Sequence, residues 1–187
     1  MYARRVGQRT LSFDFSERLF KDNLLVVDRE TGSTWSQLAG RAIRGPLAGT
    51  PLRRIPSIQT TWRYWRDRHP DTLVRVLPGA RGRPYFYRDR FLGFASPLLH
   101  RHHATRLGLG LVRAGTAIFL PLRRLRTSAD PLEIELSGAK LSVHHPGGAL
   151  TAWAEDEKGT LLPGVLTYRD AWQRFHGRSR IFPAPAS

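Results

Sequence analysis

The stretch LLVVDRETGSTWSQL, residues 24–38, decides the fold class of this chain. Its four apolar residues, 24–27, are typical of a buried β-strand that is apolar on both faces. Asp28 can accept hydrogen bonds from the backbone that follows it, and Gly32 can adopt positive φ, so DRETG predicts a turn. Residues 33–38 then resume extended structure. The stretch therefore predicts a β-hairpin with a five-residue loop.

Polar residues accompany the tryptophan of the second strand. The two-residue period of a strand places Ser33, Trp35 and Gln37 on one face. Polar groups beside a large aromatic side chain suit the floor of a ligand pocket. They equally suit a buried tryptophan whose indole N–H needs an acceptor. Together with the loop residues Asp28 and Arg29, this face is the main candidate for a ligand site.

The rest of the chain continues the β-rich pattern. Alternation at 9–15 places Leu11, Phe13 and Phe15 on one face of a strand, and residues 71–77 also read as extended. Two more hairpins are expected, with turns near 114 and 138. The predicted fold class is therefore mainly β with two or three short α-helices, an α+β arrangement.

Two short helices carry recognisable end signals. Either Thr60 or Thr61 is a suitable N-cap for the first helix, and a proline ends that helix near His69. The last helix, in TYRDAWQRFHG, is expected to begin with Thr167 as its N-cap and to end at Gly177.

Two segments of the chain resemble each other. TTWRYWRDRHPDTLV, residues 60–74, aligns without gaps with TYRDAWQRFHGRSRI, residues 167–181. Each reads as a capped helix with a tryptophan and a histidine four residues apart, followed by a helix breaker and a strand. We therefore expect a single domain with two related β-rich units and a loop-rich connector: 1–187 overall, units of about 9–77 and 104–182, and a connector at 78–103.

The histidines offer a second kind of chemistry. His69 follows Trp65 by four residues, so its imidazole is expected to pack on the indole. A role as an acid or base in catalysis is the alternative. His100, His102 and His103 are candidates for a metal site, although the flanking arginines would repel a cation. We expect no metal and no cofactor. The ligand-site candidates are Asp28, Arg29, Ser33, Trp35, Gln37 and His69, and no motif assigns a catalytic residue.

The charge of the chain suggests a further alternative. The sequence has 27 arginines and three lysines against 15 acidic residues, for a formal net charge of +15. Such an excess makes nucleic acid a candidate partner. The arginines are scattered, with no run longer than a pair, and codon bias in a GC-rich genome would also produce them. A nucleic-acid-binding protein is therefore kept as the second alternative.

Several classes of protein are disfavoured by what the sequence lacks. It has no cysteine, which excludes disulfides and a cysteine nucleophile within these residues. The N-terminus has no apolar core, so it predicts no signal peptide. The most apolar stretch, 107–122, is interrupted by Arg113 and Pro121 and does not predict a membrane span. As given, the sequence predicts a cytoplasmic protein, unless an export signal has been lost upstream.

The opening stretch resembles a prokaryotic family, the domain-of-unknown-function family 3179. The family block YDRxTxSxWSQxxGxAxxGPxxGxxL is matched by residues 28–52, and its W-x-x-W-x-x-x-x-P-x-T-x-V block by residues 62–74. RLGLGLVRAGTAIFLPLRRL resembles a later family segment, with Phe119 where tyrosine is usual. The closing helix with Trp172 resembles the C-terminal block, so the resemblance covers most of residues 9–182.

The resemblance implies a thiol or selenol redox role. Family members typically carry a C-x-x-C motif just upstream of the segment resembling RRVGQRTLSF, and some carry selenocysteine there. Either this chain is a lineage without the redox pair, or Met1 is an internal methionine and half of the first unit is missing. We favour the second interpretation, a fragment or non-catalytic form of a redox protein. A ligand- or metal-binding β-rich module is the alternative.

Overall fold

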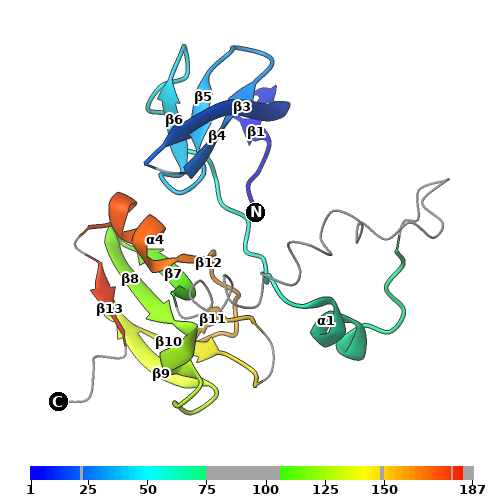
Figure 1. The fold of residues 1–187 in the computed structure, drawn as a ribbon, viewed down its shortest axis with the longest axis vertical. Coiled ribbons are helices and arrows are strands. Elements are labelled where there is room, and N and C mark those ends of the chain that lie inside the picture. The colour runs from blue at the N-terminus through cyan, green and yellow to red at the C-terminus, as the bar shows by residue number, and fades with distance from the viewer. Residues whose placement is uncertain (22, 75–105, 148–149, 178, 183–187) are drawn as a thin grey trace, which may run out of the picture.

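The structure of the chain is a computed structural model that describes residues 1–21, 23–74, 106–147, 150–177 and 179–182. In these ranges, short strands form four small sheets, accompanied by three short helices. This composition confirms the predicted α+β class. Figure 1 shows that the sheets form two bodies, an N-terminal body of strands β1–β6 and a C-terminal body of strands β7–β13.

The N-terminal body contains a two-stranded ribbon and a four-stranded antiparallel sheet. In the sheet each strand pairs with the next along the chain, so short turns suffice to connect them. Its small core consists of Leu11, Trp35, Ala42 and Leu52. The strands are β1 (Arg5–Val6), β2 (Arg9–Thr10), β3 (Phe13–Phe20), β4 (Asn23–Asp28), β5 (Thr34–Ser36) and β6 (Arg41–Arg44).

The predicted hairpin is formed by β4 and β5. Val26 pairs with Trp35 in an antiparallel register. Gly32 has a φ of 67° in the connecting loop, and the carboxylate of Asp28 accepts a hydrogen bond from the backbone N–H of Thr31 at 2.6 Å. The loop therefore closes as the sequence predicted, through an Asp-stabilised turn and a glycine with positive φ.

The expectation of one continuous strand at 9–15 was wrong. The extended structure is interrupted between β2 and β3, and Leu11 in the interruption is fully buried. Phe15, predicted on the same face as Leu11, is 72% exposed. Strand β3 lies at the edge of its sheet and is irregular beyond Phe15, so the core no longer covers it there.

The C-terminal body consists of two sheets that enclose the larger core. One sheet has the strand order β12-β7-β8-β13 and the other the order β11-β10-β9. Leu109, Leu120, Leu141 and Val143 are among the buried residues that both sheets contribute. The strands are β7 (Leu107–Arg113), β8 (Thr116–Pro121), β9 (Leu132–Leu136), β10 (Ala139–His144), β11 (Trp153–Asp156), β12 (Val165–Tyr168) and β13 (Arg180–Ile181).

Both additional hairpins are present where the sequence predicted them. The turn between β7 and β8 has positive φ at Ala114 and Gly115, and the turn between β9 and β10 has it at Ser137 and Gly138. Two successive residues with positive φ are typical of the two-residue turns whose twist matches that of the flanking strands.

Two glycines of β7 are required by close packing. A Cβ atom at Gly110 would lie 2.4 Å from the indole of Trp172, and one at Gly108 would lie 2.5 Å from both the ring of Phe119 and the carbonyl oxygen of Leu120. These glycines therefore let neighbouring groups approach the strand closely.

Three short helices complete the described structure. Helix α1 (Trp62–Arg68) begins at Thr61, whose hydroxyl accepts the backbone N–H of Tyr64 and confirms the predicted N-cap. Helix α3 (Leu122–Leu125) follows β8 directly, and helix α4 (Arg169–Phe175) follows β12. The prediction that Thr167 caps α4 was wrong, because Thr167 is still paired with Gly108 in the sheet and the cap position falls on Tyr168.

The two similar segments have the same local geometry at their helix ends. The rings of Trp65 and His69 lie 4.0 Å apart, and those of Trp172 and His176 lie 4.1 Å apart, which confirms the predicted packing of each imidazole on its indole. Both histidines are C-caps with nearly the same backbone angles, φ −134° and ψ 67° against φ −132° and ψ 56°.

The surroundings of the two helices differ. Trp172 is fully buried, and the segment after α4 forms β13, which pairs in parallel with β8. Trp65 is 37% exposed, and Leu73 in the segment after α1 is 95% exposed. In the described part of the strand predicted at 71–77, residues 71–74 pair with none of the described strands. Residues 75–77 lie outside the described ranges.

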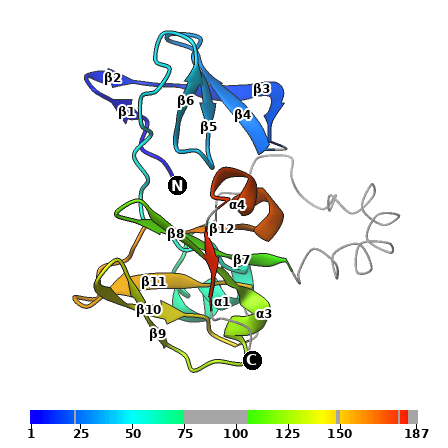
Figure 2. The ribbon, with the colours of Figure 1, turned by 90° about the vertical axis from the view of Figure 1, so that its left-hand side faces the viewer.

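Hydrogen bonds join the C-terminal body to the N-terminal body and to the segment that leads to α1. The ammonium group of Lys21, at the tip of the β3–β4 hairpin, donates to the carbonyl oxygen of Arg174 at 2.7 Å. The hydroxyl of Thr151 donates to the carbonyl oxygen of Gln59 at 2.7 Å. Figure 2 shows α4 on the side of the C-terminal body that faces the N-terminal sheet.

Candidate functional site

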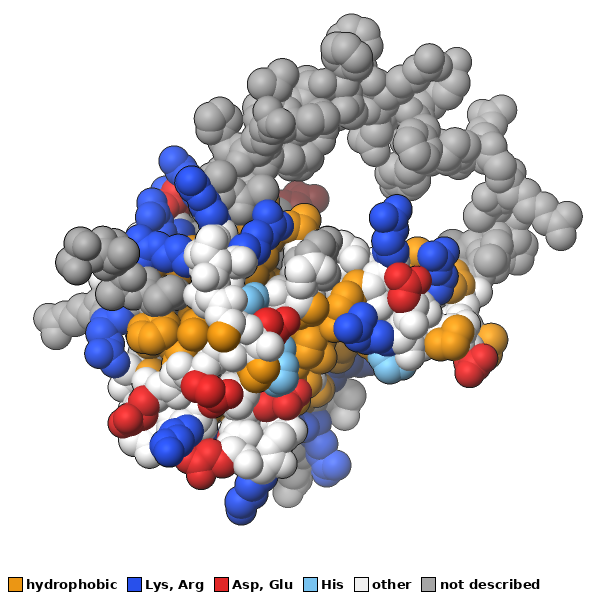
Figure 3. Space-filling model, turned by 90° about the horizontal axis from the view of Figure 1, so that it is seen from below, with side chains coloured by type: hydrophobic (Ala, Val, Ile, Leu, Met, Phe, Trp, Pro, Cys, Tyr) orange, Lys and Arg blue, Asp and Glu red, His pale blue; other side chains and the backbone are white. Residues whose placement is uncertain are grey.

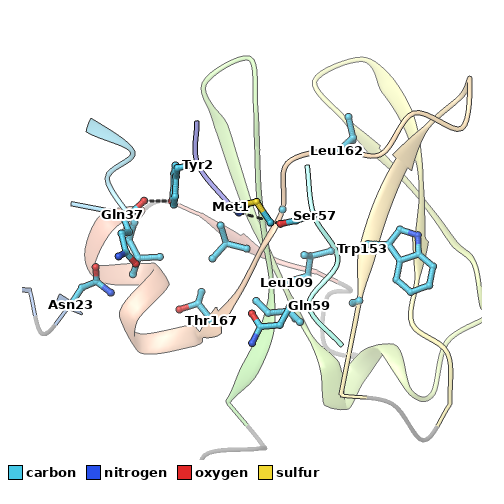
Figure 4. A pocket seen from close by; sticks show the side chains of 15 residues that line it. Met1, Tyr2, Asn23, Gln37, Ser57, Gln59, Leu109, Trp153, Leu162 and Thr167 are labelled. Atoms are coloured by element: carbon cyan, nitrogen blue, oxygen red, sulfur yellow. Dashed lines mark hydrogen bonds between the residues drawn. The ribbon is translucent and has the colours of Figure 1, made fainter. Parts of the chain in front are cut away.

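A cavity of about 270 Å³ lies between the two bodies. Residues of the N-terminal body and of the segment leading to α1 form one side, and strands β7, β11 and β12 form the other (Figure 4). We call it the central cavity. It is lined by Met1, Tyr2, Asn23, Gln37, Leu38, Ser57, Gln59, Leu109, Ala152, Trp153, Leu162, Gly164, Val165, Leu166 and Thr167.

The lining of the central cavity contains no charged side chain among the described residues. This is notable in a chain with 45 acidic and basic residues. Its polar groups are the amides of Asn23, Gln37 and Gln59 and hydroxyls such as that of Thr167, set among aliphatic residues. Such a mixture of apolar surface and a few neutral polar groups is typical of small-molecule sites.

Asn23 contributes an unpaired polar atom. Its side-chain oxygen Oδ1 is buried and has no hydrogen-bond partner among the described residues. A buried acceptor without a donor costs about 1–3 kcal/mol.

Gln37 is the one predicted ligand-site residue that lines the central cavity. It follows β5, and its backbone carbonyl accepts a hydrogen bond from the hydroxyl of Tyr2, which Figure 4 shows beside it. Burial, partly offset by the nearby Arg54, raises the pKa of Tyr2, so its hydroxyl remains a donor. The tyrosine thus fixes the position of Gln37 at the cavity.

Asp28, Ser33 and Trp35 lie together in the core of the N-terminal body and do not line the central cavity. The indole N–H of Trp35 donates to the carboxylate of Asp28 at 2.7 Å. The hydroxyl of Ser33 accepts the backbone N–H of Leu47 at 3.0 Å. This arrangement matches the interpretation of a buried tryptophan with a polar partner, and it holds the β4–β5 loop in place.

The ionisation of Asp28 reflects the same contacts. Burial, the largest single influence, raises the pKa of the carboxyl group, but hydrogen bonds from Trp35, Thr31 and Ser33 together lower it. The net pKa lies below its usual value. The carboxylate is therefore charged at neutral pH and acts as a buried acceptor.

Arg29 and His69 lie away from the central cavity. The guanidinium of Arg29 forms an exposed ion pair with Asp14, with one N–O distance of 2.8 Å. A hydrogen bond from Arg29 holds the pKa of Asp14 below its usual value. His69 packs on Trp65 at the end of α1. The structure thus gives each of these two residues a local partner and does not bring them together.

The metal candidates His100, His102 and His103 lie outside the described residues. Within the described ranges, no three histidine, aspartate or glutamate side chains gather in a way that could hold a metal ion. His145 is buried, and its Nε2 atom lies 2.6 Å from the carbonyl oxygen of Ala129. His144 stacks on Trp153 with ring centroids 5.1 Å apart.

The sequence analysis missed most of the polar groups of the central cavity. Asn23, Gln59 and Thr167 come from three segments far apart in the chain, and no motif links them. Thr167 was singled out only as a helix cap. The alignment of residues 60–74 with residues 167–181, which pairs Thr60 with Thr167, was the other feature of the sequence that pointed to this segment.

The fold and the cavity define a β-rich protein with a ligand-sized space between its two bodies, and no charged side chain of the described residues lines that space. The family model described as "Protein of unknown function (DUF3179)" matches residues 1–145, and the chain belongs to this family. The match confirms the resemblance seen in the sequence, while the closing helix with Trp172 lies beyond the matched residues. No curated protein and no solved structure matches the chain. Among the described helices, none has the length and apolar character needed to cross a membrane.

Proposed function

We propose that these residues form a non-catalytic binding domain that holds a small, neutral, polar molecule in the central cavity. The observation that supports this most directly is the lining, which combines aliphatic residues with neutral polar groups such as the amide of Asn23. The amides of Gln37 and Gln59 and the hydroxyl of Thr167 are the further groups that would orient the ligand.

The lining selects the class of ligand. A cationic ligand would lose its hydration without finding an opposite charge among the described lining residues, which costs free energy. An anionic ligand would find only the α-ammonium group of Met1, which already donates to the hydroxyl of Ser57 at 3.1 Å. A neutral molecule with hydrogen-bond donors, such as an amide or a sugar, would satisfy Asn23 and use the aliphatic wall. The volume of about 270 Å³ suits a molecule at the small end of the range for ligand pockets.

A catalytic thiol or selenol step is not part of this proposal. Such a step needs a sulfur or selenium nucleophile. Residues 1–187 contain no cysteine, so the nucleophile implied by the family resemblance would have to come from outside them. A binding role needs no such group. It therefore fits both the interpretation as a fragment and the interpretation as a natural non-catalytic form.

Nucleic-acid binding across a broad surface receives less support. On the face shown in Figure 3, acidic and basic side chains are interspersed. A protein that tracks a phosphate backbone usually presents a continuous basic stripe. The positive charge of the chain therefore does not by itself favour this function.

Ligand-observed NMR tests the proposal. Acetamide, N-methylacetamide and methyl glucoside are the neutral probes, and acetate and methylammonium are the charged ones. We expect saturation transfer to at least one neutral probe and none to the charged probes. Absence of transfer to every neutral probe, in protein shown to be folded, would remove the proposal.

Variants locate the binding. Asn23→Leu and Gln59→Leu each remove a polar group of the cavity wall. We expect each to weaken probe binding by about tenfold, the equivalent of one net hydrogen bond. Gln8→Leu is the matched control, since Gln8 is exposed in the turn between β1 and β2. Equal losses in all three variants would show that binding occurs elsewhere.

A further inference from the structure

A second, smaller cavity on the C-terminal body is dominated by arginine. It has a volume of about 180 Å³, and four guanidinium groups line it, those of Arg106, Arg123, Arg124 and Arg169. The remaining lining is apolar and includes Phe119, which is fully buried. We call it the arginine cavity. Its character is opposite to that of the central cavity, which has no charged side chain.

Regular structure brings these arginines together. Arg106 directly precedes β7, and Arg169 opens α4 directly after β12, the strand that pairs with β7. The backbone N–H of Arg169 donates to the carbonyl oxygen of Arg106 at 2.8 Å. Arg123 and Arg124 lie on α3, next to the end of β8, which pairs with β7 on its other side. Sheet pairing, rather than a flexible loop, therefore sets their positions.

Arg106 and Arg169 share one carboxylate, that of Asp170, as their ion-pair partner. None of the described residues that line it is acidic. The nearby carboxylate of Asp170 lies 2.6 Å from a nitrogen of Arg106 and 3.7 Å from one of Arg169. Guanidinium groups stay protonated at every physiological pH, so they repel one another unless an anion is present.

We infer that the arginine cavity binds the terminal phosphate group of a small molecule. Arginine forms paired hydrogen bonds with phosphate oxygens, which a single point charge cannot do. A terminal phosphate is close to dianionic at neutral pH, whereas each backbone phosphate of a nucleic acid has one charge. A recess of about 180 Å³ suits a phosphate group at the end of a molecule better than a phosphate group within a nucleic-acid strand.

Isothermal titration of the whole chain with phenyl phosphate and pyrophosphate tests the inference. The double variant Arg123→Gln/Arg169→Gln removes two guanidinium groups of the cavity. The double variant Arg18→Gln/Arg63→Gln removes two exposed guanidinium groups elsewhere, on β3 and α1, and is the charge-matched control. We expect the first variant to bind about tenfold more weakly or worse, and the control to stay within about twofold of the original chain. Equal losses in the two variants, or no binding to the original chain, would overturn the inference.

The double variant Arg123→Lys/Arg169→Lys keeps the charge and removes the paired hydrogen-bond geometry. We expect it to fold like the original chain and to recover only part of the affinity, which separates recognition by guanidinium groups from bulk attraction. Full recovery of affinity would contradict a site built on guanidinium geometry.

Competition with oligonucleotides distinguishes the two sources of phosphate. A short single strand with a 5′-phosphate should displace phenyl phosphate, and the same strand with a 5′-hydroxyl should not. Equal displacement by both strands would point to backbone phosphates and overturn the terminal-phosphate inference. Asn23→Leu should leave phosphate binding unchanged, so this inference and the proposed function can fail separately.

Discussion

The indole of Trp35 donates its N–H to the carboxylate of Asp28 at 2.7 Å, and both side chains are almost completely buried. The contact joins the start of the β4–β5 loop to the strand that follows it. Trp35 also fills the core of the N-terminal body, with Phe13 packed edge-on at 5.8 Å. This one pair thus links the shape of the loop to the packing of the sheet.

Asp28→Ala should destabilise the protein strongly. The substitution leaves the indole N–H of Trp35 and the backbone N–H of Thr31 without their acceptor. We expect the free energy of unfolding to fall by about 3 kcal/mol, measured by urea denaturation. Asp14→Ala, which breaks an exposed ion pair, is the control and should cost clearly less than Asp28→Ala. Similar losses for both variants would contradict the structural role of Asp28.

Gly110→Ala should disturb the contact between β7 and α4. The added methyl group would lie 2.4 Å from the ring of Trp172, which is fully buried and cannot move aside freely. We expect a loss of about 1–3 kcal/mol in thermal or urea unfolding. Gly147→Ala should change stability by no more than about 0.5 kcal/mol, because no atom lies within 4 Å of the new methyl group. A neutral Gly110→Ala variant would refute this packing.

The two tryptophan–histidine pairs should differ in their importance for stability. Trp172→Ala empties a buried site and should cost about 3–5 kcal/mol. Trp65→Ala changes a side chain that is 37% exposed and should cost about 1 kcal/mol or less. Urea denaturation of both variants provides the comparison. Equal costs would show that α1 packs as tightly as α4.

His176 should make stability depend on pH. Burial, together with the positive charges of Arg54 and Lys21, holds the pKa of His176 below its usual value. The unfolded chain therefore binds the proton more readily than the folded one. The stability that depends on a neutral His176 imidazole is fully present above the unfolded pKa of about 6.5. It is lost as the pH falls through the lower pKa of the folded state.

Urea unfolding between pH 5 and pH 8 measures the slope of the free energy of unfolding against pH, in the original chain and in His176→Gln. The variant should show a flatter dependence of stability on pH. Arg54→Gln should reduce the slope as well, since it removes one of the charges that lower the pKa. An unchanged slope in His176→Gln would assign the pH dependence to other groups.

Features set by a few neighbouring residues could be predicted from the sequence. The three hairpins have glycines where positive φ is needed, at Gly32, Gly115 and Gly138. The cap at Thr61 and the packing of His69 on its helix neighbour also follow from local spacing. In each case the interacting groups are within five residues of one another, so the local sequence is sufficient to predict the contact.

Features that depend on distant neighbours could not be predicted. Phe15 has strand periodicity, but its exposure depends on which face the core covers. Thr167 has the chemistry of an N-cap, but pairing with Gly108 keeps it in a strand. Leu73 and the residues beside it lack a strand to pair with, although the equivalent segment after α4 has one. The central cavity is of this kind too, since its walls come from both ends of the chain.

Strand β12 and the residue that follows it contribute to both cavities. Val165, Leu166 and Thr167 line the central cavity, and Arg169, two residues beyond Thr167, lines the arginine cavity. A molecule that shifts this four-residue strand would reshape both spaces at once. Two occupants would then be thermodynamically linked, each altering the affinity of the other by the same factor.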